Sequence, residues 1–178
     1  TCFNIYAQSY NTAKVKKEEL PKTYHDLLDP RWKGRLGIEA TTNEWFYNLV
    51  RDMGEEKGMK FFRDLVARNN PSQRIGHTVL SNLVVAGEVP FALNVYHFAA
   101  EKSKKQGAPV DWLTLDPTYA IGYGVALSKR TAHPAAAMLL YDYMITDAQT
   151  LMITKQHRVP ANKKYDSPFK NIRFKVLD

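Results

Sequence analysis

Hydrophobic positions along the chain alternate between short continuous runs and segments with helical spacing. The short runs are rich in β-branched and aromatic residues and are bounded by turn residues, which is typical of strands. Residues spaced three or four apart, such as Trp45, Leu49 and Met53, predict amphipathic helices between the runs. The predicted strands cover residues 3–7, 36–40, 91–95, 112–115 and 121–127.

The same alternation continues along most of the chain. Strands that alternate with helices favour an α/β layer architecture with a largely parallel or mixed sheet. Residues 165–178 have no clear period and are expected to form a poorly fixed tail. The other helical stripes are Phe61, Phe62, Leu65 and Val66, then Val79, Leu80, Leu83 and Val84, then Ala137, Leu140, Tyr141 and Met144.

Composition fits a folded domain but does not choose its function. The formal net charge of +7 would suit a nucleic-acid partner, yet the Lys and Arg residues are scattered and form no aromatic-interleaved stripe. No nucleic-acid partner is therefore expected. No run of about 18 apolar residues occurs, so no membrane span is expected. The single cysteine, Cys2, excludes an internal disulfide.

Motifs that carry catalysis are not found. The sequence has no phosphate loop of the type GxxxxGK[ST], no GxSxG elbow, no HExxH and no second cysteine for a CxxC site. The five histidines lie far apart and offer no metal-ligand spacing. We therefore expect a non-catalytic protein with no cofactor and no metal ligands of its own.

One run, TYHDLLDPRWKGRLGI at residues 23–38, resembles bacterial solute-binding proteins of ABC importers. Within that family the likeness is to the ferric-iron-transport branch. Four further segments resemble the family in its own order, namely YNTAKV (10–15), AGEVPFALN (86–94), GAPVDWLTLDP (107–117) and AHPAAAMLLYDYMITDAQ (132–149).

The resemblance implies the α/β fold of a type II periplasmic-binding protein, with one complete lobe plus part of the other. Residues 1–10 would cross into the second lobe, 11–106 would form it, and 107–178 would hold return strands, a late helix pair and a tail. Most of the first lobe, with the signal peptide, is expected to lie outside this sequence. Residues 23–105 should be compact, while 121–127 and 133–155 should pack outside and expose apolar surface or self-associate.

Two helix starts are candidate ligand sites, because helix N-termini direct free N–H groups and partial positive charge at anions. One is Thr41-Thr42-Asn43, after a predicted strand, and the other is Gly76-His77-Thr78. The resemblance implies that such positions contact a synergistic anion in iron-binding members. The alternative is a capping box in which Thr41 and Glu44 merely satisfy the end of their own helix.

A third candidate group, Asn94, Tyr96 and His97, follows the predicted strand at 91–95. Ferric-binding relatives carry two adjacent tyrosines here, which hold Fe(III) as phenolates. In this chain either Val95 stands in place of the first tyrosine, with Tyr96 as the second, or His97 and Phe98 stand in place of both. The sequence therefore predicts no binding of bare Fe(III), and leaves Tyr96 and His97 as an aromatic wall and a hydrogen-bonding group.

The function implied by the resemblance is capture of a small solute, either iron or an anionic or organic compound, for a cognate ABC permease. The implied location is the periplasm, or the cell exterior with a membrane anchor in a Gram-positive cell. An effector-binding domain of a transcription regulator, which can share this fold, is the alternative. A signal peptide upstream would favour transport, and a helix-turn-helix would favour regulation.

Overall fold

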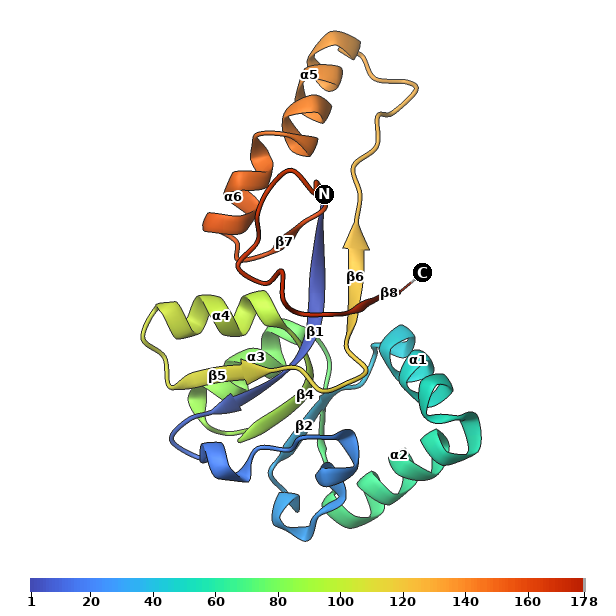
Figure 1. Ribbon diagram of the computed structural model, residues 1–178, viewed down its shortest axis with the longest axis vertical. Coiled ribbons are helices and arrows are strands. Elements are labelled where there is room, and N and C mark those ends of the chain that lie inside the picture. The colour runs from blue at the N-terminus through green and yellow to red at the C-terminus, as the bar shows by residue number, and fades with distance from the viewer. Residues whose placement is uncertain (178) are drawn as a thin grey trace.

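A computed structural model of the protein describes residues 1–177 (Figure 1). Strands and helices alternate as expected. Three short 3-10 helices, η1 (Lys17–Glu19), η2 (Tyr24–Leu28) and η3 (Pro30–Trp32), follow the first strand. The strands are β1 (Cys2–Asn11), β2 (Leu36–Glu39), β3 (Ser72–Arg74), β4 (Phe91–Tyr96), β5 (Val110–Leu113), β6 (Tyr119–Tyr123), β7 (Val159–Pro160) and β8 (Lys175–Leu177). The helices are α1 (Asn43–Met53), α2 (Glu55–Asn69), α3 (His77–Ala86), α4 (His97–Lys105), α5 (Pro134–Ile145) and α6 (Ala148–Thr154).

The sheet is mixed and follows the order β3-β2-β4-β1-β6-β8. Strands β3 and β4 both run parallel to β2, whereas β1 is antiparallel to β4. Strand β1 is long enough to serve two regions. Its second half pairs with β4 and β5, and its first half pairs with β6 and β7.

The lobe drawn in the lower part of Figure 1 contains β2, β3, β4 and the second half of β1, and helices cover both faces of these strands. Helices α1 and α2 and the 3-10 helices pack on one core, which contains Trp32, Trp45 and Phe91 at no more than 1% exposure. Helix α3 packs on a second, smaller core through Leu80 and Val84. Figure 1 shows the two helix groups on opposite sides of the central strands. This layering is the expected α/β architecture, because each helix buries one apolar stripe against the sheet.

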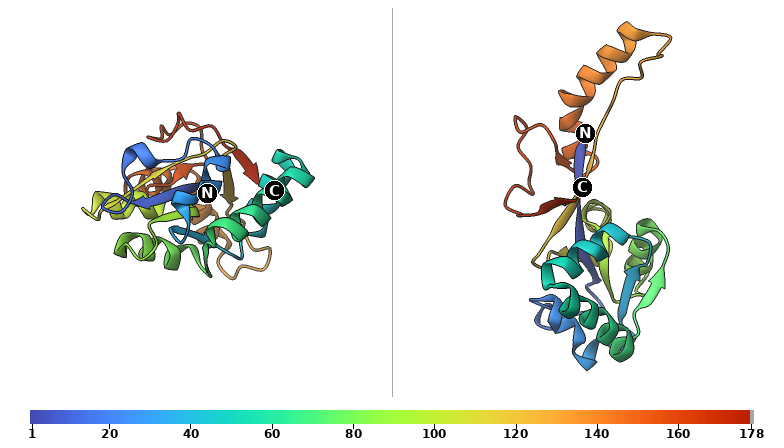
Figure 2. Two further views of the ribbon diagram at one scale, coloured as in Figure 1. Left: turned by 90° about the horizontal axis from the view of Figure 1, so that it is seen from below. Right: turned by 90° about the vertical axis from the view of Figure 1, so that its right-hand side faces the viewer.

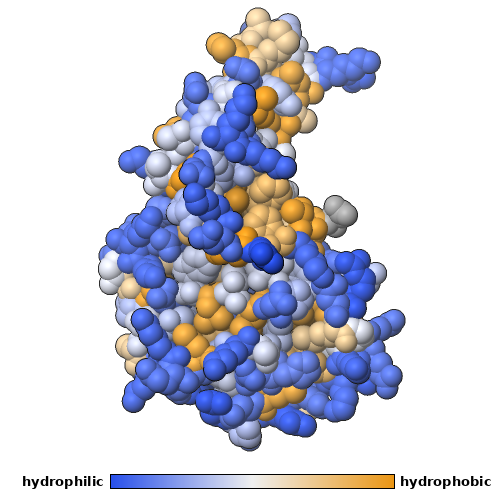
Figure 3. Space-filling model, viewed as in Figure 1, coloured by the Kyte–Doolittle hydropathy of each residue, from blue (hydrophilic) through white to orange (hydrophobic). Residues whose placement is uncertain are grey.

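An extension rises from the lobe along β1 and β6 and carries α5 and α6 (Figures 1 and 2). No residue of α5 is buried, and Met138, Leu139 and Leu140 are 58%, 73% and 59% exposed. Figure 3 shows apolar surface on this extension and in the hollow beneath it. The expectation that residues 133–155 pack outside the lobe and expose apolar surface is confirmed.

The expected poorly fixed tail is wrong for residues 165–177. Strand β8 pairs in parallel with β6, and Phe169, only 8% exposed, packs with Ile5 and Ala120. The segment lacks a sequence period because it contributes isolated anchors rather than a regular helix or a long strand. The β6 strand also ends at Tyr123, so the predicted strand over 121–127 is shorter than expected.

Candidate functional site

The carboxyl ends of β2, β3 and β4 lie at one edge of the lobe because these three strands are parallel. Helix α1 begins just after β2, and α3 begins just after β3. Residues near 39–44, 74–78 and 94–96 are therefore brought together from distant parts of the sequence. Ligands of open α/β sheets gather at such an edge. Tyr6 of β1 and Tyr123 of β6 also contact Tyr96 there. We call the whole group the edge site, and its members are Tyr6, Glu39, Thr42, Glu44, His77, Tyr96 and Tyr123.

Glu39, the last residue of β2, holds the centre of the edge site and is only 3% exposed. Its carboxylate accepts hydrogen bonds from Thr41 N at 3.0 Å, Thr41 Oγ1 at 2.5 Å and Gly76 N at 2.9 Å. The Thr42 hydroxyl is a fourth donor. Burial alone would raise the pKa of Glu39, but these hydrogen bonds outweigh it and lower the pKa to about 2.

Four donors at the two predicted helix starts are thus bonded to a side chain of the protein itself and not to an oxyanion. The alternative capping box is wrong. Thr41 bonds to Glu39, the helix cap Thr42 makes no side-chain cap bond, and Glu44 accepts a hydrogen bond from Tyr6. Of the other predicted helix-start residues, Asn43 and Thr78 are exposed.

His77 connects this carboxylate to the aromatic part of the edge site. Its Nδ1 lies 2.9 Å from the Asn94 carbonyl oxygen, and its Nε2 lies 3.3 Å from the Thr42 hydroxyl. The imidazole packs on the Tyr96 ring with centroids 4.1 Å apart. Burial lowers the pKa of His77, and the charge of Glu39 opposes that effect.

Asn94 is fully buried and braces β2 rather than facing solvent. Its Oδ1 accepts the Glu39 N–H at 2.8 Å, and its Nδ2 donates to the Glu39 carbonyl at 3.0 Å. Both ends of the amide are therefore occupied by backbone. Asn94 holds Glu39 in position and has no donor or acceptor directed at the edge.

His97 does not join the other candidates, and the expectation that it shares a space with Tyr96 needs correction. It is fully buried, its Nδ1 accepts the Ile5 N–H at 3.0 Å, and its ring meets Trp112 and Phe169 edge-on. Successive residues at a strand end point to opposite faces, so Tyr96 and His97 separate. Burial lowers the pKa of His97 to about 4.

Three tyrosines from three strands meet where the lobe joins the extension, and we call them, with Glu44, the tyrosine cluster. Tyr6 of β1 is the cross-strand partner of Tyr96 of β4, with ring centroids 5.2 Å apart. The Tyr96 and Tyr123 hydroxyls are 3.5 Å apart, and the Tyr6 hydroxyl donates to Glu44 Oε1 at 2.8 Å. Burial, together with hydrogen bonding to Tyr96 and Glu44, raises the pKa of Tyr6.

Sequence reasoning missed Glu39, Tyr6 and Tyr123. Tyr123 lies 27 positions from Tyr96, and Tyr6 lies further still on the other side, so no local motif contains them. One feature of the sequence could have identified Glu39. It is an acidic residue ending an apolar strand directly before two threonines, and a polar residue there must find buried partners.

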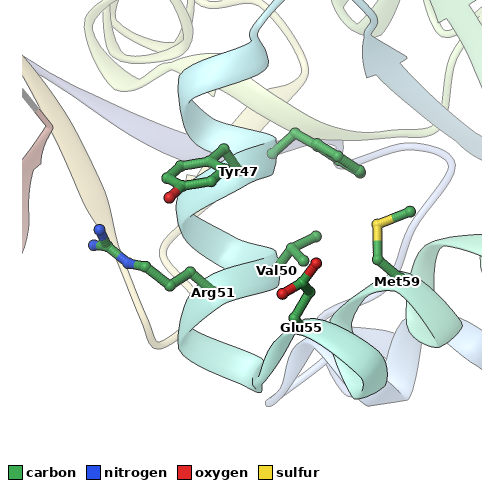
Figure 4. Close-up of a pocket in the computed structure, with 6 residues that line it drawn as sticks. Tyr47, Val50, Arg51, Glu55 and Met59 are labelled. Carbon is green, nitrogen blue, oxygen red and sulfur yellow. The ribbon is translucent and has the colours of Figure 1, made fainter.

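Three surface hollows lie around α1, and the one of about 350 Å³ reaches the tyrosine cluster at Glu44. One of about 270 Å³ lies between α1 and α2, and Figure 4 shows that its side chains come from both helices. A second, of about 260 Å³, adjoins Glu39 and Thr42 on the α1 side. Among residues 1–177, no three His, Cys, Asp or Glu side chains gather as a metal site. The first hollow is lined by Phe46, Tyr47, Val50, Arg51, Glu55 and Met59.

Over residues 3–178 the sequence matches the family described as bacterial extracellular solute-binding protein. The chain belongs to this family. It is 26% identical over 167 residues to iron uptake protein A1 of Synechocystis, a match that covers 85% of this chain and 46% of that protein. The chain therefore spans about half the length of this solute-binding relative.

Solved structures of solute-binding proteins share the fold. Iron-bound HitA from Pseudomonas aeruginosa superposes with a TM-score of 0.70 at 21% identity, over 97% of this chain and 58% of that one. AfuA from Actinobacillus pleuropneumoniae, with fructose-6-phosphate bound, gives 0.74 at 20% identity, over 99% and 57%. The α/β fold of the periplasmic-binding-protein type is confirmed. Within residues 1–177, no helix has the length and apolar character needed to span a membrane.

Proposed function

We propose that this chain captures a small solute outside the cytoplasm and delivers it to a cognate ABC permease, without catalysis. Membership of the extracellular solute-binding family supports transport over the regulatory alternative. The proposed location is the periplasm, or the outer face of a Gram-positive membrane. The edge site is the proposed place of capture, since it lies at the carboxyl ends of parallel strands.

The solute that the tyrosine cluster favours is a hard cation, with ferric iron as the leading case. Phenol and carboxylate oxygens are the donors that hard metal ions prefer. Tyr96, Tyr123 and Glu44 supply three such groups, while His77 and Phe98 lie against the Tyr96 ring and leave it little free face for an organic cation. The names of relatives, including iron uptake protein A1, agree with this choice.

The meeting of the Tyr96 and Tyr123 hydroxyls is the observation that carries this proposal. The sequence-based expectation of no Fe(III) binding assumed that Tyr96 stands alone. In the structure its partners come from β1 and β6 instead of from the adjacent residue. Binding would displace the phenol proton of Tyr96, whose pKa is raised by burial, so affinity should increase with pH.

The experiment is a titration of metal-free protein with ferric nitrilotriacetate, followed by visible absorption. Ferric capture predicts a phenolate-to-iron band that Tyr96→Phe abolishes and Tyr123→Phe weakens or shifts. Tyr47→Phe, at a residue 63% exposed on α1, is the matched control and should leave the band unchanged. A titration without any band, or a band equal in all four proteins, would count against ferric iron as the solute.

The exposed apolar face of α5 is the proposed contact surface for self-association of this chain. Its members Met138, Leu139, Leu140 and Tyr143 and the neighbouring Leu151 on α6 are all more than 40% exposed. Contiguous apolar surface of this kind commonly marks a protein contact. The permease contact is proposed from family membership alone.

A further inference from the structure

Two helix starts and one strand end converge on a single carboxylate at the edge site. Helices α1 and α3 both begin here, and helix N-termini attract negative charge through their free N–H groups and partial positive charge. In this chain the negative charge comes from Glu39. Two of its hydrogen bonds come from backbone N–H groups, Thr41 N and Gly76 N, and two come from the Thr41 and Thr42 hydroxyls.

The surroundings of Glu39 show that this arrangement replaces an ion pair. A buried carboxylate needs charged or hydrogen-bonding partners, since losing water is costly. Among residues 1–177 no Lys, Arg or His forms a salt bridge with Glu39, although this part of the chain contains eight other ion pairs. The charge of Glu39 is therefore stabilised by hydrogen bonds from the two helix starts and not by a charged side chain.

We propose that Glu39 determines specificity at the edge site by excluding oxyanions, because its carboxylate fills the position where a phosphate, a sulfate or a solute carboxylate would bind. An incoming oxyanion would find these four donors of Thr41, Thr42 and Gly76 occupied and would meet the charges of Glu39 and Glu44. This inference rests on the proposed function in treating the edge site as the place of capture. It narrows the solute class to cations and neutral compounds.

The same carboxylate is linked to the tyrosine cluster. Thr42 contacts both Glu39 and His77, and His77 packs on Tyr96. For a cation at the Tyr96 and Tyr123 hydroxyls, the protein itself thus supplies Glu44 within the tyrosine cluster and Glu39 behind Thr42 and His77. A bound oxyanion is not needed to bring negative charge to this place.

The test is a titration with inorganic phosphate, read from the amide signals of Thr41 and Gly76 in ¹⁵N NMR spectra. The wild-type protein should give no saturable shift at either amide. Glu39→Ala frees four donors and leaves room for the anion, so it should gain saturable shifts and bind phosphate at least about tenfold more tightly. Saturable phosphate binding at these two amides in the wild type would overturn the proposal.

Glu44→Ala is the matched control, since it removes one nearby negative charge without freeing the helix-start donors. It should not gain phosphate binding. An equal gain in both variants would mean that the loss of one negative charge explains the binding, and this would contradict the proposal. If Glu39→Ala is unfolded without phosphate, circular dichroism should show that phosphate restores folding while chloride at equal ionic strength does not. Failure of phosphate to do so would also contradict it. None of these readouts uses iron, so the ferric proposal can fail independently.

Discussion

The Tyr6 hydroxyl donates a 2.8 Å hydrogen bond to Glu44 Oε1, across 38 positions of sequence. This bond ties the start of α1 to β1, the strand that the lobe and the extension share. It also fixes the carboxylate beside the Tyr96 ring, which packs on Tyr6. The geometry of the tyrosine cluster therefore depends on a residue that is itself 1% exposed.

Tyr6→Phe should lower stability, because it keeps the ring packing and removes only the hydroxyl that bonds to a charged group. We expect a loss of about 1 to 3 kcal/mol in the free energy of unfolding, measured by urea denaturation. If iron is bound, the visible band should also weaken as Glu44 is released. Tyr47→Phe is the control, since that side chain is 63% exposed. Equal stability of the two variants would show that the bond to Glu44 contributes nothing.

Asn94→Ala should destabilise the protein more than any change at the exposed Asn43. Asn94 is fully buried and satisfies both the N–H and the carbonyl of Glu39, so alanine leaves two buried backbone groups unpaired. The expected cost is about 2 to 4 kcal/mol in urea denaturation. Asn43→Ala should stay within about 0.5 kcal/mol of the wild type. The reverse order would mean that Asn94 is not a brace of β2.

Lowering the pH should reduce the free energy of unfolding through protonation of His97. Its pKa is lowered by burial from 6.5 to about 4 in the folded protein, so the unfolded chain takes up a proton first as the pH falls. Stability should therefore drop between about pH 6.5 and pH 4, by up to about 3 kcal/mol, and the contribution should level off below that range.

His97→Gln keeps an acceptor for the Ile5 N–H and has no charge to titrate, so it should remove this part of the pH dependence. His133→Gln, at an exposed position, is the control and should keep the wild-type slope. Urea denaturation at a series of pH values measures both. An unchanged slope in His97→Gln would show that His97 is not the titrating group.

Gly58→Ala should destabilise the protein even though alanine normally favours a helix by about 1 kcal/mol. A Cβ at Gly58 would lie 2.6 Å from Val50 Cα and 2.7 Å from the Val50 carbonyl oxygen, so α1 and α2 would have to separate. We expect a loss of about 1 to 3 kcal/mol. Gly124→Ala, where an added Cβ meets nothing within 4 Å, is the matched control. A stabilised Gly58→Ala would mean that the two helices can move apart freely.

Leu139→Glu should reduce self-association through α5. Leu139 is 73% exposed, and a charge there would be buried without a partner in any apolar contact. Sedimentation velocity at several protein concentrations should show a shift toward monomer. Gln106→Glu adds the same charge at an exposed site after α4 and should leave association unchanged. A monomeric wild type would remove the proposed contact altogether.

The sequence by itself determined the alternation of strands and helices and placed the two helix starts within residues 41–43 and 76–78. These features depend on local periodicity and turn residues, and both are patterns among residues close together in the sequence. It also marked Tyr96 and the exposed apolar segment at 133–155. The family resemblance added the expected fold, which the comparison with solved structures confirmed.

Only the tertiary structure decided which side chains meet at the edge site and which of their hydrogen-bonding groups are already paired. Pairing of β1 with β4 and β6 brought Tyr6 and Tyr123 to Tyr96, and strand alternation turned His97 into the core. The parallel arrangement of β2 and β3 set Gly76 against Glu39, so a side chain filled what the sequence presented as an open anion site. Contacts between residues far apart in the chain decide such matters, because burial and the pairing of polar groups depend on neighbours that no local pattern records.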